Sequence, residues 1–280
     1  MQRVAFQMHP DVRLLNLPES DLDAVITGGV IDSDDFQYDE RKIRYAIEEE
    51  ARNQPGASVL VLSEENLSGH VYSGWNCRRN ADRLRRLIPE AKILFVIRNQ
   101  ESYIASAYLN FVNDGGAWTF DRWIADYSYP VSSIFDKLQY HRILEYYQSL
   151  FGKENVLVLP YEMLAEQSGA MFMNSFFRFV GLRELSATEF VGKADKKINR
   201  SLSPLGARFG RAFYGITGGV TPIRRKFVKA ADLVIKAMIP WQQSLKSGNR
   251  HKLISGRFFD SNRKTSELIG IDLGKYGYEV

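Results

Sequence analysis

Residues 93–108 read "ILFVIRNQESYIASAY". Five apolar residues lead directly into Arg98, and the segment that follows has helical character and carries Ser106. Apolar residues on both alternating faces are typical of a parallel strand buried between helices. We therefore predict a buried strand that ends at an arginine, followed by a helix that begins near Gln100.

Two other short runs have the same character, and helical patterns separate the three. The runs are "SVLVLS" (Ser58 to Ser63) and "NVLVLP" (Asn155 to Pro160). The helical patterns cover Asp34 to Gly56, with Phe36 among their apolar positions, then Asn80 to Glu90 and Phe135 to Gly152. Strands that alternate with helices predict an α/β fold, a parallel sheet flanked by helices.

The domain organisation follows from where this alternation stops. From about Leu185 onward the sequence is polar and then mostly helical. We predict one domain over residues 1–280, with an α/β core at 1–184 and a mostly helical part at 185–280 that completes the ligand site.

Composition sets broad limits on the class of protein. The chain has 280 residues, 45% of them hydrophobic and 25% charged, which is ordinary for a globular domain. The net charge of +4 is compatible with an anionic ligand. Cys77 is the single cysteine, so no intrachain disulfide can form, and we predict a reducing, cytoplasmic location. No apolar run approaches the roughly 20 residues that span a bilayer.

Three groups are expected to converge where the strand before Arg98 ends. Ligands of open parallel sheets bind outside the carboxyl ends of the strands. The free N–H groups of the next helix point into the same region, and Ser106 lies further along that helix on the same face as Ser102. This set suits a doubly charged phosphate. The alternative is a surface ion pair for Arg98 and a packing role for Ser106, and spacing alone favours that alternative.

A resemblance to a known family changes this balance. "FVIRNQESYIASAYLNFVNDG" (residues 95–115) resembles the 3′-phosphate-binding segment of sulfotransferases that use 3′-phosphoadenosine 5′-phosphosulfate (PAPS). That family places an arginine at the strand end and a serine eight residues later, and both bind the 3′-phosphate. Arg98 and Ser106 fall on these positions. The family usually has proline where this chain has Gln100.

Other segments resemble the same family in the same order along nearly the whole chain. They are "HPDV" (His9 to Val12), "VLSEENLSG" (Val61 to Gly69), "FGKENVLVLPYEML" (Phe151 to Leu164), "FFRFVGL" (Phe176 to Leu182), "KKINRSLSP" (Lys196 to Pro204) and "SNRKTSELIGIDLGKYGY" (residues 261–278). The resemblance implies a P-loop-kinase-like sulfotransferase fold. It also implies transfer of a sulfuryl group from PAPS, which leaves as 3′-phosphoadenosine 5′-phosphate, to a hydroxyl of a carbohydrate or glycolipid.

The resemblance also implies roles for basic residues and for a carboxylate. Family members close a basic loop over the nucleotide. Lys196, Lys197 and Arg200 are therefore candidates for a second set of nucleotide-binding residues, besides Arg98 and Ser106. The alternative for that loop is a solvated run of charge. For the general base we expect Glu65, which follows the strand "SVLVLS". Glu19 is the second candidate for the base.

Glu65 and the histidines have simpler interpretations as well. Glu64 and Glu65 together suit the first turn of a helix, where the helix dipole favours negative charge. The four histidines show no metal-ligand spacing, so we expect no metal. His70 has a route to the site through the "NLSGH" loop, although a lone histidine is more often a surface residue.

Partners and rival functions complete the predictions. Residues 223–239 form a basic amphipathic segment, which predicts either a packed helix with a solvated face or a peripheral membrane contact. We expect no nucleic-acid partner. A nucleotide or sugar kinase is one rival, but the "GxxxxGK[ST]" loop is absent. A non-catalytic protein that binds the nucleotide or a polyanion is the other.

The N-terminus adds one more expectation. "MQRVAFQM" resembles the family's first helix, and the strand and the Lys/Gly/Thr-rich loop that wrap the 5′-phosphosulfate in that family would precede it. No other segment of this chain combines an apolar strand with that loop chemistry. We therefore expect an N-terminally truncated reading of a longer protein that keeps the 3′-phosphate half-site but is unstable and nearly inactive.

Overall fold

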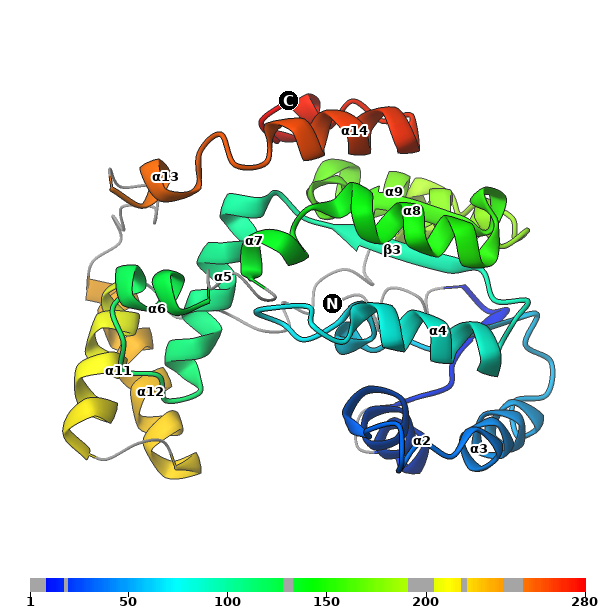
Figure 1. Ribbon diagram of the computed structural model, residues 1–280, viewed down its shortest axis with the longest axis horizontal. Coiled ribbons are helices and arrows are strands. Elements are labelled where there is room, and N and C mark those ends of the chain that lie inside the picture. Colours follow the sequence, from blue (N-terminus) through cyan, green and yellow to red (C-terminus); the bar gives the residue numbers. More distant parts are fainter. Residues whose placement is uncertain (1–8, 18–19, 128–132, 191–203, 218–220, 239–248) are drawn as a thin grey trace.

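The chain forms an α/β fold in which helices surround parallel strands (Figure 1). The structure is a computed structural model that describes residues 9–17, 20–127, 133–190, 204–217, 221–238 and 249–280. Its strands are β1 (Val12–Leu14), β2 (Val59–Val61), β3 (Ile93–Ile97) and β4 (Val156–Pro160). Among the described residues they form two parallel pairs, β1 with β2 and β3 with β4. The three predicted strands are therefore confirmed as β2, β3 and β4.

The helices before β4 connect and cover the strands. They are α2 (Asp21–Val25), the π-helical η1 (Ile26–Asp32), α3 (Glu40–Arg52), the 3-10 turn η2 (Glu65–Ser68), α4 (Cys77–Leu87), α5 (Gln100–Asn113), α6 (Phe120–Asp126), α7 (Ile134–Lys137), α8 (Tyr140–Phe151) and the 3-10 turn η3 (Lys153–Asn155).

The part after β4 is helical where the structure describes it. It contains the 3-10 segment η4 (Tyr161–Gly169), α9 (Ala170–Phe179), α10 (Ala187–Phe190), α11 (Pro204–Thr217), α12 (Pro222–Met238), α13 (Asn249–Ile254), α14 (Phe259–Ile269) and the 3-10 turn η5 (Leu273–Tyr276). No helix within the described ranges combines the length and the apolar character needed to cross a bilayer.

The β3–β4 pair is covered by helices on both faces, as its uninterrupted apolar sequence predicts. Alternate strand residues such as Phe95 and Val158 pack into the core formed with α4, α5 and α8, where Phe95 meets Tyr147 edge to face at 4.7 Å. The strand residues that point to the opposite face, such as Leu159, pack against α9, where they meet Phe177 and its neighbours. The carboxyl ends of β3 and β4 thus sit on a rigid base.

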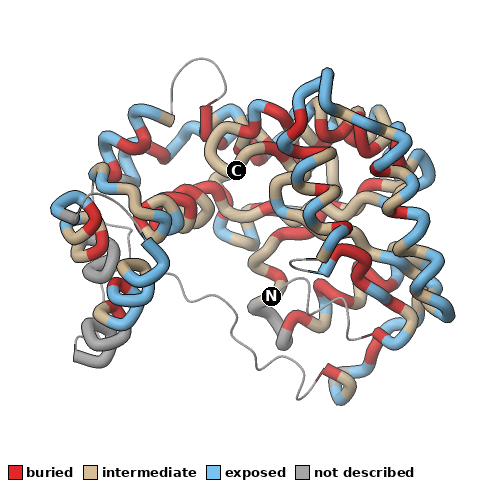
Figure 2. Tube along the Cα trace, turned by 90° about the horizontal axis from the view of Figure 1, so that it is seen from below, coloured by how far each residue is buried: buried red, intermediate tan, exposed pale blue. Residues whose placement is uncertain are grey.

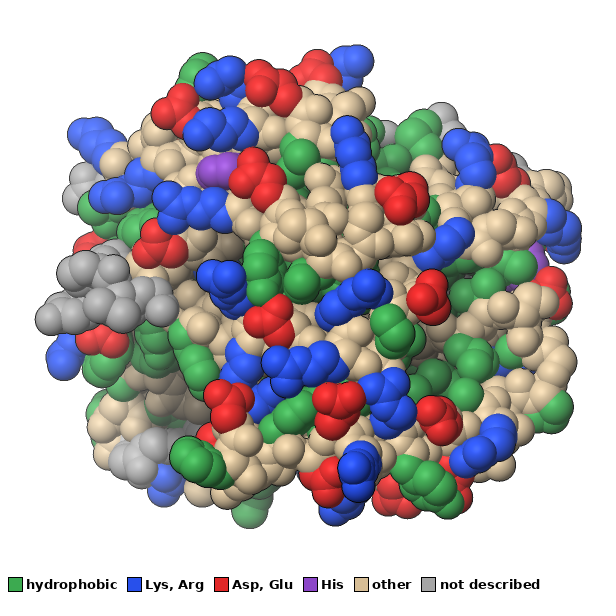
Figure 3. Space-filling model, turned by 45° about the vertical axis from the view of Figure 1, so that its right-hand side comes forward, with side chains coloured by type: hydrophobic (Ala, Val, Ile, Leu, Met, Phe, Trp, Pro, Cys, Tyr) green, Lys and Arg blue, Asp and Glu red, His purple; other side chains and the backbone are tan. Residues whose placement is uncertain are grey.

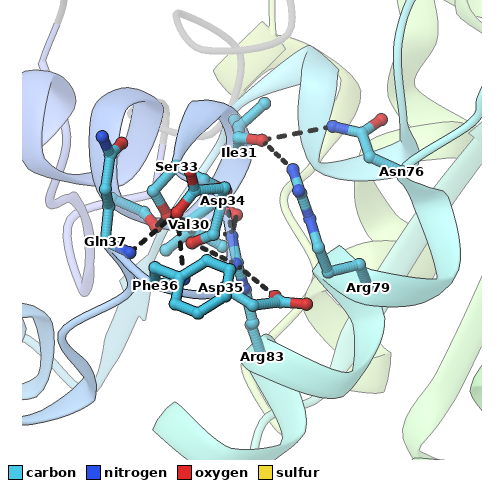
Figure 4. Close-up of polar contacts among 11 residues, drawn as sticks. Val30, Ile31, Ser33, Asp34, Asp35, Phe36, Gln37, Asn76, Arg79 and Arg83 are labelled. Atoms are coloured by element: carbon cyan, nitrogen blue, oxygen red, sulfur yellow. Dashed lines mark hydrogen bonds and ion pairs between the residues drawn. The ribbon is translucent and has the colours of Figure 1, made fainter.

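A buried arginine joins the N-terminal helices to α4 (Figure 4). The side chain of Arg83 is 3% exposed and donates to the carbonyl oxygens of Val30 and Ser33, both at 2.9 Å. It also pairs with Asp35 at 2.9 Å. Carbonyl groups at a helix end need such donors because they lack partners within the helix. Arg83 therefore fixes the end of η1 against α4.

Two features differ from the predictions. The helix predicted from Asp34 begins later, at Glu40, because Asp34 accepts from the backbone N–H of Phe36 and forms a turn, and Asp39 caps the helix. Phe36 is consequently fully exposed rather than on the buried stripe. The strand β1 was not predicted, since three residues are too few to show a period.

Candidate functional site

The site begins with Arg98, at the carboxyl end of β3. Ile97 is paired with Pro160, so the residues that follow, Arg98 and Tyr161, lie side by side, and the Arg98 guanidinium stacks 5.0 Å from the centre of the Tyr161 ring. The guanidinium is half-buried and makes no ion pair or hydrogen bond to another described residue. A half-buried guanidinium that has no ion-pair partner among the described residues is suited to bind an anionic ligand.

The backbone of Arg98 is fixed by a buried tyrosine. The hydroxyl of Tyr140 donates to the Arg98 carbonyl oxygen at 2.6 Å and accepts from the Arg98 N–H at 3.3 Å. Burial raises the pKa of Tyr140 far above its ordinary value. The tyrosine therefore stays neutral and can make both hydrogen bonds at any physiological pH.

The start of α5 is held by contacts from distant parts of the chain. Asn99 caps the helix by accepting from the N–H of Ser102 at 3.1 Å. Its own N–H donates to Glu162 at 2.9 Å, and the Tyr278 hydroxyl donates to the other oxygen of that carboxylate at 3.1 Å. Asn99 also donates to the Gly277 carbonyl at 2.7 Å. Glu162 lies in the first turn of η4 and at the same time accepts from the residue that caps α5.

Gln100 has a structural role that the sequence did not reveal. It is 2% exposed, and its side-chain amide donates to Asn262 Oδ1 at 2.5 Å and accepts from Asn262 Nδ2 at 3.3 Å. Asn262 is fully buried on α14 and also donates to the Glu279 carbonyl at 2.8 Å. Gln100 therefore uses its side chain to attach α5 to the C-terminal part, which proline at this position cannot do.

Ser106 lies on α5 within two turns of the helix start. It is half-buried, on the same face as Ser102, and its hydroxyl makes no hydrogen bond to another described residue. The structure thus places Arg98 and Ser106 on one strand–helix unit, with a free fork at the strand end and a free hydroxyl on the helix.

Glu65 lies in the short turn after β2, where the dipole interpretation also placed it. Glu64 is the capping residue and accepts from the N–H of Asn66 at 3.2 Å, whereas the Glu65 side chain is exposed. The Glu65 charge acts on Tyr103, whose pKa is raised first by burial and then by this carboxylate. Arg98 acts on the same tyrosine with the opposite sign. Tyr103 therefore lies within electrostatic reach of both Arg98 and Glu65.

Lys137 is a member of this group that sequence reasoning missed. Its ammonium donates to the carbonyl oxygens of Gly69 and His70, at 3.2 and 3.0 Å, and lies 5.6 Å from the centre of the Tyr103 ring. Burial lowers the pKa of Lys137 to about 8, against the opposing effects of Cys77 and Glu65. The only signal in the sequence was one lysine at the start of the helical pattern that begins at Phe135, next to the polar residues Asp136 and Gln139.

His70 approaches the same group through the loop after η2. Its Nδ1 lies 3.0 Å from the Ser73 hydroxyl. Its pKa is lowered by burial and, to a smaller extent, by the positive charge of Lys137. A neutral imidazole is therefore favoured near neutral pH.

The remaining predicted residues are not placed. Lys196, Lys197, Arg200 and Glu19 lie outside the described residues. Within the described part of the chain, no group of three or more His, Cys, Asp or Glu side chains is arranged to hold a metal ion.

Comparison with known proteins identifies the family and the fold. The model of a family described as "Sulfotransferase family" matches residues 32–183, more than half of the 280. The crystal structure of a sulfotransferase from Alicyclobacillus acidocaldarius superposes with a TM-score of 0.55 at 16% sequence identity, over 99% of this chain and 92% of that one. No curated protein matches the sequence. The structural likeness establishes the fold, and the family match establishes that this chain belongs to the sulfotransferase family.

Proposed function

We propose that this chain transfers a sulfuryl group from PAPS to a hydroxyl of a carbohydrate or glycolipid acceptor. The observation that carries the proposal is Arg98, a half-buried guanidinium without a described ionic partner, stacked on Tyr161 at the start of α5. The Arg98 guanidinium, the half-buried Ser106 hydroxyl on the helix that follows and the N-terminus of that helix suit the 3′-phosphate that separates PAPS from common nucleotides.

The proposal assigns the nucleotide to both parts of the chain. Arg98 and Ser106 would bind the 3′-phosphate, and Lys196, Lys197 and Arg200 would close over the nucleotide. The division into a core at 1–184 and a completing part at 185–280 is supported by Asn262 and Tyr278, because both stabilise the start of α5 from beyond residue 185.

The reaction needs a base for the acceptor and a fixed path for the sulfuryl group. The acceptor oxygen forms a new bond to sulfur, the bond from sulfur to the bridging oxygen breaks, and that oxygen leaves with its electron pair as part of 3′-phosphoadenosine 5′-phosphate. Glu65 would take the acceptor proton. Lys137 holds the Gly69 and His70 carbonyls and so fixes the loop that follows Glu65. Positioning and charge stabilisation account for catalysis of such in-line transfers.

Two measurements test the proposal. Titration calorimetry should show that 3′-phosphoadenosine 5′-phosphate binds at least about 10-fold more tightly than AMP, because only the former carries the 3′-phosphate. Incubation with radiolabelled PAPS and a carbohydrate and lipid extract should label an acceptor. Equal affinity for the two nucleotides, or tighter binding of ATP, would contradict the proposed donor.

A further inference from the structure

The α11–α12 hairpin concentrates positive charge to an unusual degree. Residues 204–238 contain seven Lys or Arg and a single acid, Asp232, for a net charge of +6. Because the whole chain has a net charge of +4, the remainder carries −2. The face of the molecule in Figure 3 instead intersperses Lys and Arg with Asp and Glu. The hairpin segment therefore has a more positive net charge than the chain as a whole, although α4 is also basic.

The same hairpin exposes large apolar side chains. Ile216, Ile223 and Phe227 are 86%, 80% and 53% exposed. The Phe227 ring lies 5.1 Å from that of Phe213 and 6.2 Å from that of Phe209, so the two helices share one apolar surface. The hairpin lies at one side of the molecule, and its outer surface is largely exposed (Figure 2).

Cations border this apolar surface. Lys226 and Lys229 are both exposed on α12. With Thr221, Pro222 and Arg225 they line a shallow hollow of about 340 Å³. Arg225 is paired with Asp114 at 3.3 Å, which anchors this part of α12 to the end of α5. Exposed Ile and Phe side chains beside lysines are the composition of helices that lie in a lipid–water interface.

We infer that the α11–α12 hairpin binds the surface of a membrane that contains anionic lipids. A second copy of the chain is disfavoured as the occupant, because a two-fold contact would bring two surfaces of net charge +6 together. Anionic headgroups instead complement the lysines, while the acyl boundary accommodates Ile216, Ile223 and Phe227.

The hairpin is joined to the candidate site by one helix. Arg211 of α11 donates to the Tyr108 hydroxyl of α5 at 2.9 Å, and Gly210 packs against Val112. The other end of α5 follows Arg98 directly. A hairpin bound to lipid would hold the site close to the membrane surface, where an acceptor carried by a lipid is found.

Vesicle sedimentation with the full chain, without nucleotide, tests the inference separately from the proposed chemistry. We expect binding to phosphatidylcholine vesicles that contain about one third phosphatidylglycerol, and much weaker binding to phosphatidylcholine alone. Replacing Lys226 and Lys229 by Gln should weaken binding roughly 25-fold, since each surface cation contributes about 5-fold. The double variant Ile216→Ser/Ile223→Ser should weaken it at least about 10-fold.

Matched controls come from α3 and the loop before it. Arg41→Gln/Lys42→Gln removes the same charge from another exposed site, and Phe36→Ser removes a fully exposed aromatic ring. Both should bind like the wild type. Equal binding to neutral vesicles, or hairpin variants that bind as well as these controls, would overturn the inference. So would a dimer in solution that Ile216→Ser/Ile223→Ser dissociates without any loss of vesicle binding.

Discussion

Arg98 and Tyr161 are neighbours because β3 and β4 run parallel in a register that pairs Ile97 with Pro160. Each residue is the first beyond its strand, and the guanidinium lies 5.0 Å from the ring centre. The Tyr161 ring restricts the position of the Arg98 guanidinium without neutralising its charge. The stacking therefore holds the guanidinium while leaving its charge without an ion-pair partner among the described residues.

Replacing Arg98 by alanine should weaken binding of 3′-phosphoadenosine 5′-phosphate by roughly 1.5 to 3 kcal/mol, because a charge-assisted contact is lost. Ser106→Ala should cost about 1 kcal/mol, as a neutral contact. Neither change should alter the affinity for AMP. Arg122→Ala is the matched control, since that arginine also stacks on a ring, Trp118, but away from the site. Calorimetry measures the affinity of each variant for both nucleotides. Equal losses of affinity for the two nucleotides would show that Arg98 and Ser106 do not bind the 3′-phosphate.

Tyr161→Leu should weaken binding of the same nucleotide about 2- to 5-fold, because Arg98 loses its stacking surface. Tyr161→Phe keeps the ring and should bind like the wild type. If Phe and Leu behave alike in the calorimeter, the stacking does not position Arg98.

Glu65→Gln should lower turnover by on the order of 10² to 10⁴ while nucleotide affinity stays unchanged, since an amide keeps the shape of the side chain but takes no proton. Glu64→Gln is the control, because its amide oxygen can still accept from Asn66. Initial rates with labelled PAPS provide the measurement. Normal turnover in Glu65→Gln, together with loss of turnover in Glu19→Gln, would move the base to Glu19.

Asn262→Ala should lower the free energy of unfolding by about 2 to 3 kcal/mol, because it leaves the buried amide of Gln100 without a partner. The loss should be clearly smaller in a Gln100→Ala background, since the two amides act as a pair. Asn110→Ala is the control, because Asn110 is an exposed residue of α5, the helix that carries Gln100. Its free energy of unfolding should stay within about 0.5 kcal/mol of the wild-type value. Denaturant titrations would contradict the pairing if the two losses simply added.

Lys137 should make stability depend on pH. Its pKa is about 8 in the folded chain against an ordinary 10.5, so between these values the unfolded chain binds more protons than the folded one. Stability should therefore rise with pH across this window, by on the order of 1 to 3 kcal/mol relative to Lys137→Met.

Lys92→Met, which removes an exposed lysine, provides the comparison for that experiment. The free energy of unfolding of Lys92→Met should change between pH 7.5 and pH 10 by the same amount as that of the wild type. If the free energy of unfolding of Lys137→Met also changes with pH as in the wild type, the pKa of Lys137 is not lowered by burial in the folded chain.

Local patterns were enough to predict three of the four described strands and the position of Arg98. The apolar runs at β2, β3 and β4 each mark a strand, although Leu60 of β2 is exposed, and a strand end fixes where the next residue lies. The start of the helix was placed too early because Asp34 closes a turn and Asp39 caps the helix, and these side-chain hydrogen bonds outweigh the apolar period.

The supports of the site were beyond local prediction. Gln100 and Asn262 are 162 positions apart, and Tyr278 is 116 positions from Glu162. No short pattern relates such partners, because only the folded chain brings them together. Lys137 was missed for the same reason, since its partners Gly69 and His70 lie on another segment. The roles of Lys196, Lys197 and Arg200 remain predictions.

The contacts of Tyr278 with Glu162 and of Gly277 with Asn99 also have a consequence for the order of events during synthesis. Arg98 leaves the ribosome long before residue 278 does, so on a nascent chain Glu162 and Asn99 lack these partners. Contacts between residues so far apart in sequence form late in folding, because a long loop must close first. We therefore expect the region around Arg98 to reach its final structure only after residues 277 and 278 have been translated, well after the β3–β4 core has formed.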